Sequence, residues 1–361
     1  MLFINDKPIR LIELFAGIGS QAKALKNLGL NFEHWRVCEF DEHAIRSYNA
    51  IHDTNFVTSD ITLIHAADLG ISQTDKFTYL LTYSFPCQDL SNAGKGAGME
   101  KGSGTRSGLL WEVERLLNEC TELPQVLLME NVPQVHGAKN KEHFDQWLAF
   151  LENKGYSNHW QDLNAKDYGI PQSRNRCYMV SILGDYFYEF PKPMKLHTAI
   201  KDFITDFDTP RKVNQTLEPY FADTWKREYT SPNGTIKVFD GERQGVFNSN
   251  YANRRIYSMY GVCPTITTNV AINISELKGR LNTLELWKLM GFTAGDYEKA
   301  HSTNIPEGEL QKQAGNSIVV NVLMAIFKEL FIPQTISHPY IEGLPPEAFM
   351  IEPELIEDWM L

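Results

Sequence analysis

The sequence predicts a doubly wound α/β fold with a mostly parallel sheet, followed by a smaller domain that is irregular or rich in β-strands. The first half alternates short β-branched and aromatic runs with helical stretches, which is typical of parallel strands joined by crossover helices. After about Pro191 this alternation stops, and Pro, Asn and Gly interrupt the apolar runs. A chain of 361 residues is long enough for both parts.

The elements of the first half follow from local signals. Short apolar runs predict strands at 10–15, 36–39, 56–58, 78–83 and 125–130. Helices are predicted at 20–28, from a cap at 41 to about 51, and at about 109–120. Regular helix signal returns at 283–290 and at 316–330, and the last of these helices should pack back on the first domain.

Charge is unevenly distributed along the chain. The net charge of -11 argues against a nucleic-acid partner, because phosphate neutralisation requires Lys and Arg. The segment 192–262 nevertheless holds 11 Lys and Arg against 8 Asp and Glu, whereas 341–361 holds six acidic residues and no basic one. Acidic residues are thus concentrated away from the middle of the chain, so the net charge does not exclude a nucleic-acid partner for that segment.

Other composition signals concern the compartment and the cysteines. The amino terminus lacks the basic start and apolar run of a signal peptide, and no long uncharged apolar stretch is present, so we expect a cytoplasmic protein without membrane contact. The five cysteines are far apart and form no Cys-x-x-Cys pair. This spacing indicates neither a zinc site nor a disulfide framework.

Ligand-binding groups follow the predicted strands. In open parallel sheets ligands gather at the carboxyl ends of the strands. The first strand runs into a glycine turn that opens a helix, the second is followed by Glu39, and the third by Asp60. A glycine turn with an acid at the next strand end suggests an adenosine-containing cofactor, either a dinucleotide or S-adenosylmethionine, and the glycines do not separate the two.

The fourth and fifth strand ends carry groups suited to covalent chemistry. Cys87 stands behind a proline, where a helix amino terminus or nearby arginines could lower its thiol pKa and raise the thiolate fraction. Glu130 in a pocket could keep its proton and act as an acid, and Arg174 and Arg176 could orient it and hold the polar edge of a substrate. An inert buried thiol, a helix cap and a solvated turn are the alternative interpretations. The glycine-rich stretch 91–107 is either a solvated linker or an active-site lid.

Five motifs in order resemble those of the DNA cytosine-5 methyltransferases, in particular the bacterial and phage enzymes of restriction-modification systems. They are Phe15-Ala16-Gly17-Ile18-Gly19, Pro86-Cys87-Gln88-Asp89-Leu90-Ser91, Glu130-Asn131-Val132, Gln172-x-Arg174-x-Arg176 and Gly315-Asn316-Ser317. The resemblance spans about 11–330 and departs from the family pattern at Ser20 and Asp89. It implies the S-adenosylmethionine-dependent methyltransferase fold, S-adenosylmethionine as cofactor with S-adenosylhomocysteine as product, and a monomer acting on double-stranded DNA. A cognate restriction endonuclease could act on the same site.

The resemblance also implies roles for residues. Cys87 would attack C6 of a flipped cytosine, Glu130 would protonate or hydrogen-bond N3, Arg176 would hold O2, and Arg174 would support the pocket. Glu39 would bind the ribose and Asp60 the adenine of the cofactor, within a site made of Phe15, Ala16, Gly17, Ile18, Gly19, Glu39, Asp60, Ile61, Pro86, Asn316 and Ser317. Contacts with the substrate would come from Gln88, Ser91, Asn131, Val132 and Gln172. Contacts with phosphates or guanines would come from Arg211, Lys212, Arg227, Arg254 and Arg255. Any one of these five cations could instead belong to a solvated surface.

The resemblance leads to a domain assignment and to rival functions. The catalytic domain should comprise 1–191 and about 305–361, and the small domain about 192–304, with a target-recognition segment at about 192–262. An RNA cytosine-5 methyltransferase of the same family is the nearest alternative, but the roughly 70 residues between Pro191 and Gly261 favour DNA. A non-catalytic nucleic-acid-binding member is disfavoured by the intact cysteine, glutamate and arginines. A dehydrogenase gives Cys87 no role.

Overall fold

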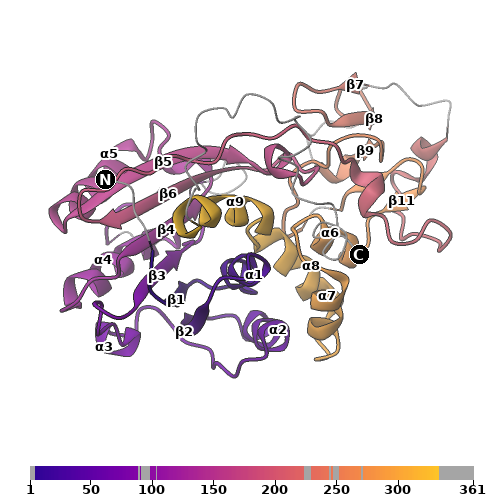
Figure 1. Ribbon diagram of the computed structural model, residues 1–361. Coiled ribbons are helices and arrows are strands. Elements are labelled where there is room, and N and C mark those ends of the chain that lie inside the picture. The colour runs from indigo at the N-terminus through magenta and orange to yellow at the C-terminus, as the bar shows by residue number, and fades with distance from the viewer. Residues whose placement is uncertain are drawn as a thin grey trace, which may run out of the picture.

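The computed structural model describes residues 5–87, 90, 98–102, 104–222, 229–243, 245–246, 252–269 and 271–332. Its larger unit contains a six-stranded sheet in the order β2-β1-β3-β4-β6-β5 (Figure 1). The strands are β1 Ile9–Leu14, β2 Phe32–Cys38, β3 Thr78–Tyr83, β4 Val126–Asn131, β5 Tyr156–Asn164 and β6 Asn175–Leu183. The first four strands pair in parallel, and only β6 runs antiparallel to its neighbours β4 and β5. The predicted α/β class with a mostly parallel sheet is confirmed.

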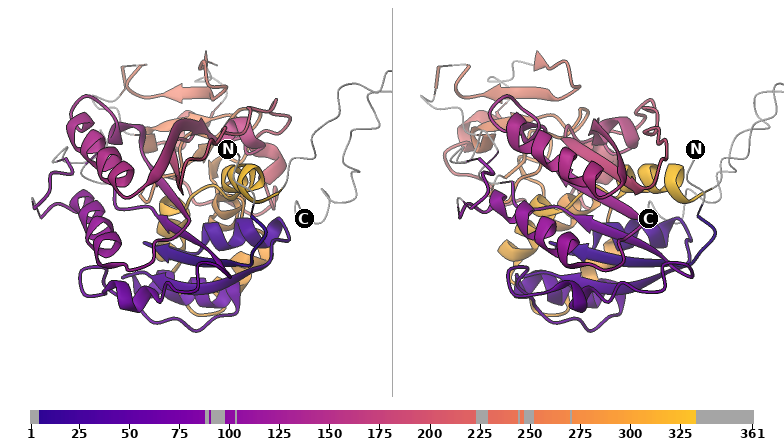
Figure 2. Two further views of the ribbon diagram at one scale, coloured as in Figure 1. Left: turned by 60° about the vertical axis from the view of Figure 1, so that its left-hand side comes forward. Right: turned by 90° about the vertical axis from the view of Figure 1, so that its left-hand side faces the viewer.

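Helices cover both faces of this sheet (Figure 2). Successive side chains of a strand point to opposite faces, so Ile9 and Leu11 join the core that includes the first and last helices, while Ile12 and Leu14 join the core on the other face. The helices are α1 Ser20–Asn27, α2 Glu42–His52, α3 Ala66–Leu69, α4 Leu110–Glu119, α5 Lys141–Asn153, α6 Thr283–Lys288, α7 Ala294–His301, α8 Glu307–Asn316 and α9 Val320–Phe331. This two-sided cover leaves the strand ends as the place where a ligand can reach the sheet.

A smaller five-stranded sheet forms the second unit, with the order β11-β10-β9-β8-β7 (Figure 1). Its strands are β7 Tyr229–Thr230, β8 Ile236–Asp240, β9 Arg255–Tyr257, β10 Asn273–Ile274 and β11 Gly279–Arg280. A small apolar cluster with Leu217, Phe239 and Ile256 supports it. The short strands and long connections agree with the predicted irregular or β-rich second domain.

Two sequence predictions about elements are wrong. No strand forms at 56–58, because the side chain of Asn49 donates to the carbonyl of Phe56 at 2.8 Å and accepts from its N–H at 2.9 Å, which replaces a strand ladder. No single helix runs from 316 to 330 either. Asn316 ends α8, Ser317 is extended, and α9 begins at Val320. The helix α5 and the strands β5 and β6 were not anticipated.

The contacts of α7 concern the boundary at which the second unit ends. Residues 294–301, which the sequence analysis assigns to the small domain without predicting a helix, form α7, which packs on α2 of the large unit. A buried ion pair joins Lys23 of α1 to Asp296 of α7 at 2.7 Å, and Lys299 reaches Asp53 at 2.9 Å. We therefore propose that α7 belongs to the catalytic domain and that the second unit ends before it.

One stretch of the described chain is long and apolar enough to cross a membrane by length and composition. It runs from Glu307 to Phe331 and comprises α8 and α9, and 67% of its apolar window is buried inside the molecule. Leu323, Ile326 and Phe327 of α9 lie in the core with α1. The apolar character of this stretch is therefore explained by its packing in the core of the molecule.

Candidate active site

A cavity of about 650 Å³ lies at the carboxyl ends of β1, β2, β3 and β4. It brings together most of the predicted site residues, from segments that are far apart in the chain. Those that line it are Phe15, Gly17, Ile18, Glu39, Asp60, Ile61, Pro86, Cys87, Glu130, Asn131, Val132, Arg174, Arg176, Asn316 and Ser317. The position of the cavity agrees with the strand-end rule used on the sequence.

The glycine turn after β1 is held in an unusual backbone conformation. Phe15, Gly17 and Gly19 have φ angles of 58°, 56° and 81°. The N–H of Gly17 donates to Oε2 of Glu39 at 2.8 Å, and Oε1 of Glu39 accepts from Asp41 N at 2.8 Å. The turn after β1 and the end of β2 are thus fastened together by one carboxylate, whose pKa burial raises.

Two glycines of this turn serve different purposes. A Cβ on Gly19 would lie 2.3 Å from Nε2 of His52, so the close approach of α2 excludes any side chain there. A Cβ on Gly17 would meet nothing within 4 Å and would project into open space beside the cavity. Ala16 and Gly19 do not line the cavity, so their contribution to the site is through the shape of the turn.

Cys87 is positioned from both sides of its loop. The hydroxyl of Ser107 donates to the carbonyl of Pro86 at 2.7 Å, and Nδ2 of Asn131 donates to the carbonyl of Phe85 at 2.9 Å. Burial raises the pKa of the Cys87 thiol, Glu130 adds to the rise, and Arg176 and Arg174 oppose it. The neighbouring arginines thus act on the thiol pKa in the predicted direction, but burial outweighs them and the pKa is raised.

Glu130 and Arg176 form an ion pair in the cavity wall. Nε of Arg176 lies 3.3 Å from Oε1 of Glu130, and the two side chains are only 15% and 10% exposed. Burial raises the pKa of Glu130, although Arg176 and Arg174 lower it in part. A buried carboxyl group with a raised pKa is suited to donate a proton, and its arginine partner fixes its orientation.

Arg174 joins three chain segments beneath the site. Nη1 donates to the carbonyl of Ile266 at 2.8 Å, and Nη2 donates to those of Gly315 and Ser317 at 3.0 and 2.8 Å. Burial, with Arg176, lowers its pKa to about 9, which leaves the guanidinium charged at neutral pH. Arg174 therefore ties the segments that carry Ile266, Gly315 and Ser317 together at the wall of the cavity.

Several predicted contact residues are committed elsewhere. Gln172 is fully buried, donating to the carbonyl of Leu289 and accepting from the N–H of Ile266, so its prediction as a substrate contact is wrong. The prediction that Arg211 contacts phosphate or guanine is also wrong, because its guanidinium is buried in an ion pair with Glu285 at 2.9 Å. Arg255 is half-buried and pairs with Asp240 at 3.1 Å. Gln88, Ser91 and Arg227 lie outside the described residues, as do positions 91–97 and 103 of the predicted lid.

Sequence reasoning missed some residues of the cavity. These are Cys38, Phe40, Asp41, Ala44, Ser59, Thr62, Ser84, Phe85, Arg106, Leu109, Lys312 and Gln313. Phe40 is 77% exposed despite its aromatic ring, and it directly follows Glu39. An aromatic residue beside an acid at a strand end was the available signal for a surface on which a purine could stack.

One group of possible metal ligands occurs among the described residues, which the cysteine spacing did not predict. Atoms of His136, Asp162 and Cys177 all lie within 4.8 Å of one another. Nε2 of His136 and Oδ1 of Asp162 are 3.0 Å apart, and burial raises the pKa of the Cys177 thiol. The free protein thus holds a His–Asp pair beside a protonated thiol.

The fold and the cavity define an α/β enzyme that combines a strand-end nucleoside-type site with a cysteine, a buried acid and two arginines. The sequence pattern described as C-5 cytosine-specific DNA methylase matches residues 9–332, and the chain belongs to that family. It is a DNA cytosine-5 methyltransferase, and the resemblance seen in the five motifs is confirmed.

Relatives and solved structures agree with this assignment. The orphan methyltransferase M.SssI of Spiroplasma monobiae is 32% identical, over 90% of this chain and 98% of its own length. The type II methyltransferase M2.ScrFI of Lactococcus lactis subsp. cremoris is 30% identical, over 90% and 100%. The crystal structure of S. pombe Dnmt2 methyltransferase has a TM-score of 0.63 at 18% identity, over 90% of this chain and 98% of that one, which is a likeness of fold.

Proposed function

We propose that Cys87 is the nucleophile that adds to C6 of a cytosine in double-stranded DNA, with S-adenosylmethionine as the methyl donor. The observation that carries this proposal is the meeting of Cys87, Glu130 and Arg176 in the one cavity that also contains the glycine turn and Glu39. Because C6 cannot be reached inside a duplex, the target base has to be flipped into this cavity.

The residues present fit S-adenosylmethionine. The turn at Gly17 leaves room for a ligand close to its backbone, and the carboxylate of Glu39 lines the cavity, where it can accept from ribose hydroxyls. Oδ1 of Asp60 bonds to Thr62, while Oδ2 has no hydrogen bond within the described chain and can accept from the adenine amino group. Phe40 offers its ring for stacking, and Asn316 lines the same wall. When bound, the cofactor supplies an electrophilic methyl group.

The chain's own residues control protons and the covalent bond. Cys87 starts as a thiol because of its raised pKa, and it releases its proton to solvent water as Sγ bonds to C6. Glu130 gives its proton to N3, which keeps charge from building on the ring, and Arg176 holds O2. After C5 has received the methyl group, water removes the C5 proton, the Sγ–C6 bond breaks to release Cys87 as a thiolate, and N3 returns its proton to Glu130.

On the DNA side, an open pocket of about 690 Å³ beside the small sheet supports a phosphate contact. It is lined by two cations, Lys212 and Arg280, and by amide side chains such as Asn253 and Asn269. Lys212 is exposed, and we retain it with Arg254 as candidate DNA contacts within the recognition segment 192–262. We further propose that the protein acts as a monomer, and a cognate restriction endonuclease would read the same site without touching it.

The substitution Cys87→Ala tests the mechanism. We expect methyl transfer to DNA to be lost while S-adenosylmethionine still binds, because the thiol bonds to the base. Cys120→Ala is the matched control, since Cys120 is a half-buried thiol outside the cavity. Methyl transfer is measured with radiolabelled cofactor and binding by calorimetry. Full activity in Cys87→Ala would overturn the proposal.

A trapping experiment separates DNA from RNA as the substrate. 5-Fluorocytosine has no C5 proton to lose, so methylation leaves the enzyme bound through Cys87. We expect a stable adduct, seen on a denaturing gel, with substituted duplex DNA. An adduct only with substituted RNA would favour the RNA methyltransferase alternative.

A further inference from the structure

The segment that carries Asp60 into the cavity has little regular structure of its own. Asp60, Ile61 and Thr62 line the cavity, and a helix, α3, starts only at Ala66. Oδ1 of Asp60 accepts from the N–H and the hydroxyl of Thr62 at 2.9 and 2.8 Å. These bonds shape the turn but lie within the segment, so they do not fasten it to the rest of the protein.

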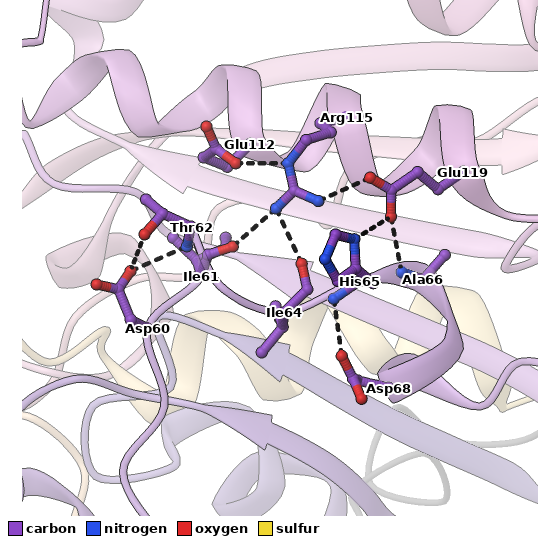
Figure 3. Close-up of polar contacts among 10 residues, drawn as sticks. All are labelled: Asp60, Ile61, Thr62, Ile64, His65, Ala66, Asp68, Glu112, Arg115 and Glu119. Carbon is purple, nitrogen blue, oxygen red and sulfur yellow. Dashed lines mark hydrogen bonds and ion pairs between the residues drawn. The ribbon is translucent and has the colours of Figure 1, made fainter.

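One side chain of α4 fastens this segment (Figure 3). Nη2 of Arg115 donates to the carbonyls of Ile61 and Ile64 at 3.0 and 2.9 Å. Its Nε donates to Glu112 at 2.7 Å and its Nη1 to Glu119 at 2.8 Å, so carboxylates of the same helix hold the guanidinium in place. The planar fork of arginine can make these bonds together, whereas the ammonium group of lysine cannot.

The second oxygen of Glu119 extends the attachment. Oε2 accepts from the N–H of Ala66 at 3.0 Å and contacts Nδ1 of His65 at 3.2 Å (Figure 3). The hydrogen bonds from Ala66 and Arg115 lower the pKa of Glu119 to about 2, so the carboxylate stays ionised at neutral pH. Both ends of the stretch 61–66 are therefore tied to α4.

The same helical unit also fixes the nucleophile. Ser107, in the 3₁₀ turn η1 (Ser107–Leu109) that leads directly into α4, donates to the carbonyl of Pro86 at 2.7 Å. The Asp60 segment and the Cys87 loop are thus attached to one continuous helix. This arrangement sets the spacing between the adenine end of the cavity and the reacting thiol.

We propose that Arg115, with Glu119, is a positioning residue for the cofactor: it holds the segment 60–66 so that Asp60 faces the adenine. Arg115 is not among the residues that line the cavity and acts through the backbone of Ile61 and Ile64. The inference rests on the proposed role of Asp60 in binding the adenine of S-adenosylmethionine.

The variant Arg115→Lys tests the role in cofactor binding. We expect the Kd for S-adenosylmethionine and for S-adenosylhomocysteine to rise about tenfold, while kcat at saturating cofactor stays within about twofold, because the reacting groups are untouched. Arg36→Lys is the matched control. Arg36 donates to the carbonyl of Asp68, outside the stretch 61–66, and we expect its loss to leave the Kd unchanged. Equal Kd values for Arg115→Lys and the wild type would overturn the inference.

A double-variant cycle with Asp60→Asn shows whether Arg115 acts through Asp60. We expect Asp60→Asn to weaken cofactor binding, and Arg115→Lys to add little in that background. If the effects of the two substitutions on Kd are fully additive, the inference about Arg115 is overturned, while the proposed role of Asp60 stands. An unchanged Kd in Asp60→Asn would remove the proposed role of Asp60 and, with it, the inference. If Arg115→Lys does not fold, Glu119→Gln takes its place, with an expected rise of about threefold in Kd.

Discussion

The two ends of the cavity are built in different ways. The cofactor end depends on backbone geometry, with three positive φ angles between Phe15 and Gly19 and N–H groups held by Glu39. The reaction end depends on side chains that come from separate strand ends, namely Cys87, Glu130 and Arg176. The first should therefore be sensitive to an added Cβ, and the second to changes of charge that leave shape unaltered.

Glu130→Gln should have the largest effect and tests the charge-dependent end. Glutamine has the same shape but no proton to give to N3, so we expect methyl transfer to fall about a hundredfold or more. The rate is measured under single-turnover conditions with saturating DNA and cofactor, and cofactor binding serves as the control for folding. A fall of less than threefold would contradict the role of Glu130 as acid.

The same variant predicts a change in the pH dependence of Cys87. The charge of Glu130 helps to raise the pKa of this thiol, so its removal should lower that pKa. Because iodoacetamide reacts with the thiolate, the curve of alkylation rate against pH should move to lower pH in Glu130→Gln. Peptide mass spectrometry follows Cys87 and, as an internal control, Cys120, whose curve should not move. A shift of the Cys87 curve to higher pH would contradict the prediction that Glu130 raises the pKa of this thiol.

Gly19→Ala comes next and tests the backbone-dependent end. The positive φ and the approach of His52 together should lower the free energy of unfolding by about 2–4 kcal/mol and weaken cofactor binding. Gly29→Ala is the control, because Gly29 has a φ of 66° and open space around its Cβ position, so it carries only the conformational cost of about 1 kcal/mol. Chemical denaturation measures the free energy of unfolding of both variants. An equal loss in Gly19→Ala and Gly29→Ala would contradict a clash between the added Cβ and His52.

Phe40→Leu should have the smallest effect. Leucine keeps an apolar side chain but removes the ring, so we expect the Kd for S-adenosylmethionine to rise about fivefold, equivalent to about 1 kcal/mol. Calorimetry with the cofactor measures this, and Val57→Ala, another exposed apolar side chain but outside the cavity, is the control. An unchanged Kd would show that the exposed ring does not stack on the cofactor.

Three buried strands of the large sheet were predicted from the sequence, although β6, which is also largely buried, was not. The strands β1, β3 and β4 lie within one residue of their predicted bounds, because these central strands are buried along almost their whole length and are rich in apolar residues. The edge strand β5 was missed, since its exposed positions interrupt the apolar pattern. Residues 56–58 have strand-like composition, but the side chain of Asn49 takes their hydrogen bonds.

In the candidate site, too, local sequence signals predicted some features and only the tertiary structure decided others. The sequence by itself determined the family, the order of the motifs and the strand ends where Cys87 and Glu130 stand, because these are local signals. Only the tertiary structure decided which cations are available. Arg211 and Glu285 are 74 positions apart yet form a buried ion pair, and Arg115 reaches carbonyls more than 50 positions away. Charge pairing depends on distance in space, which the spacing along the chain does not contain.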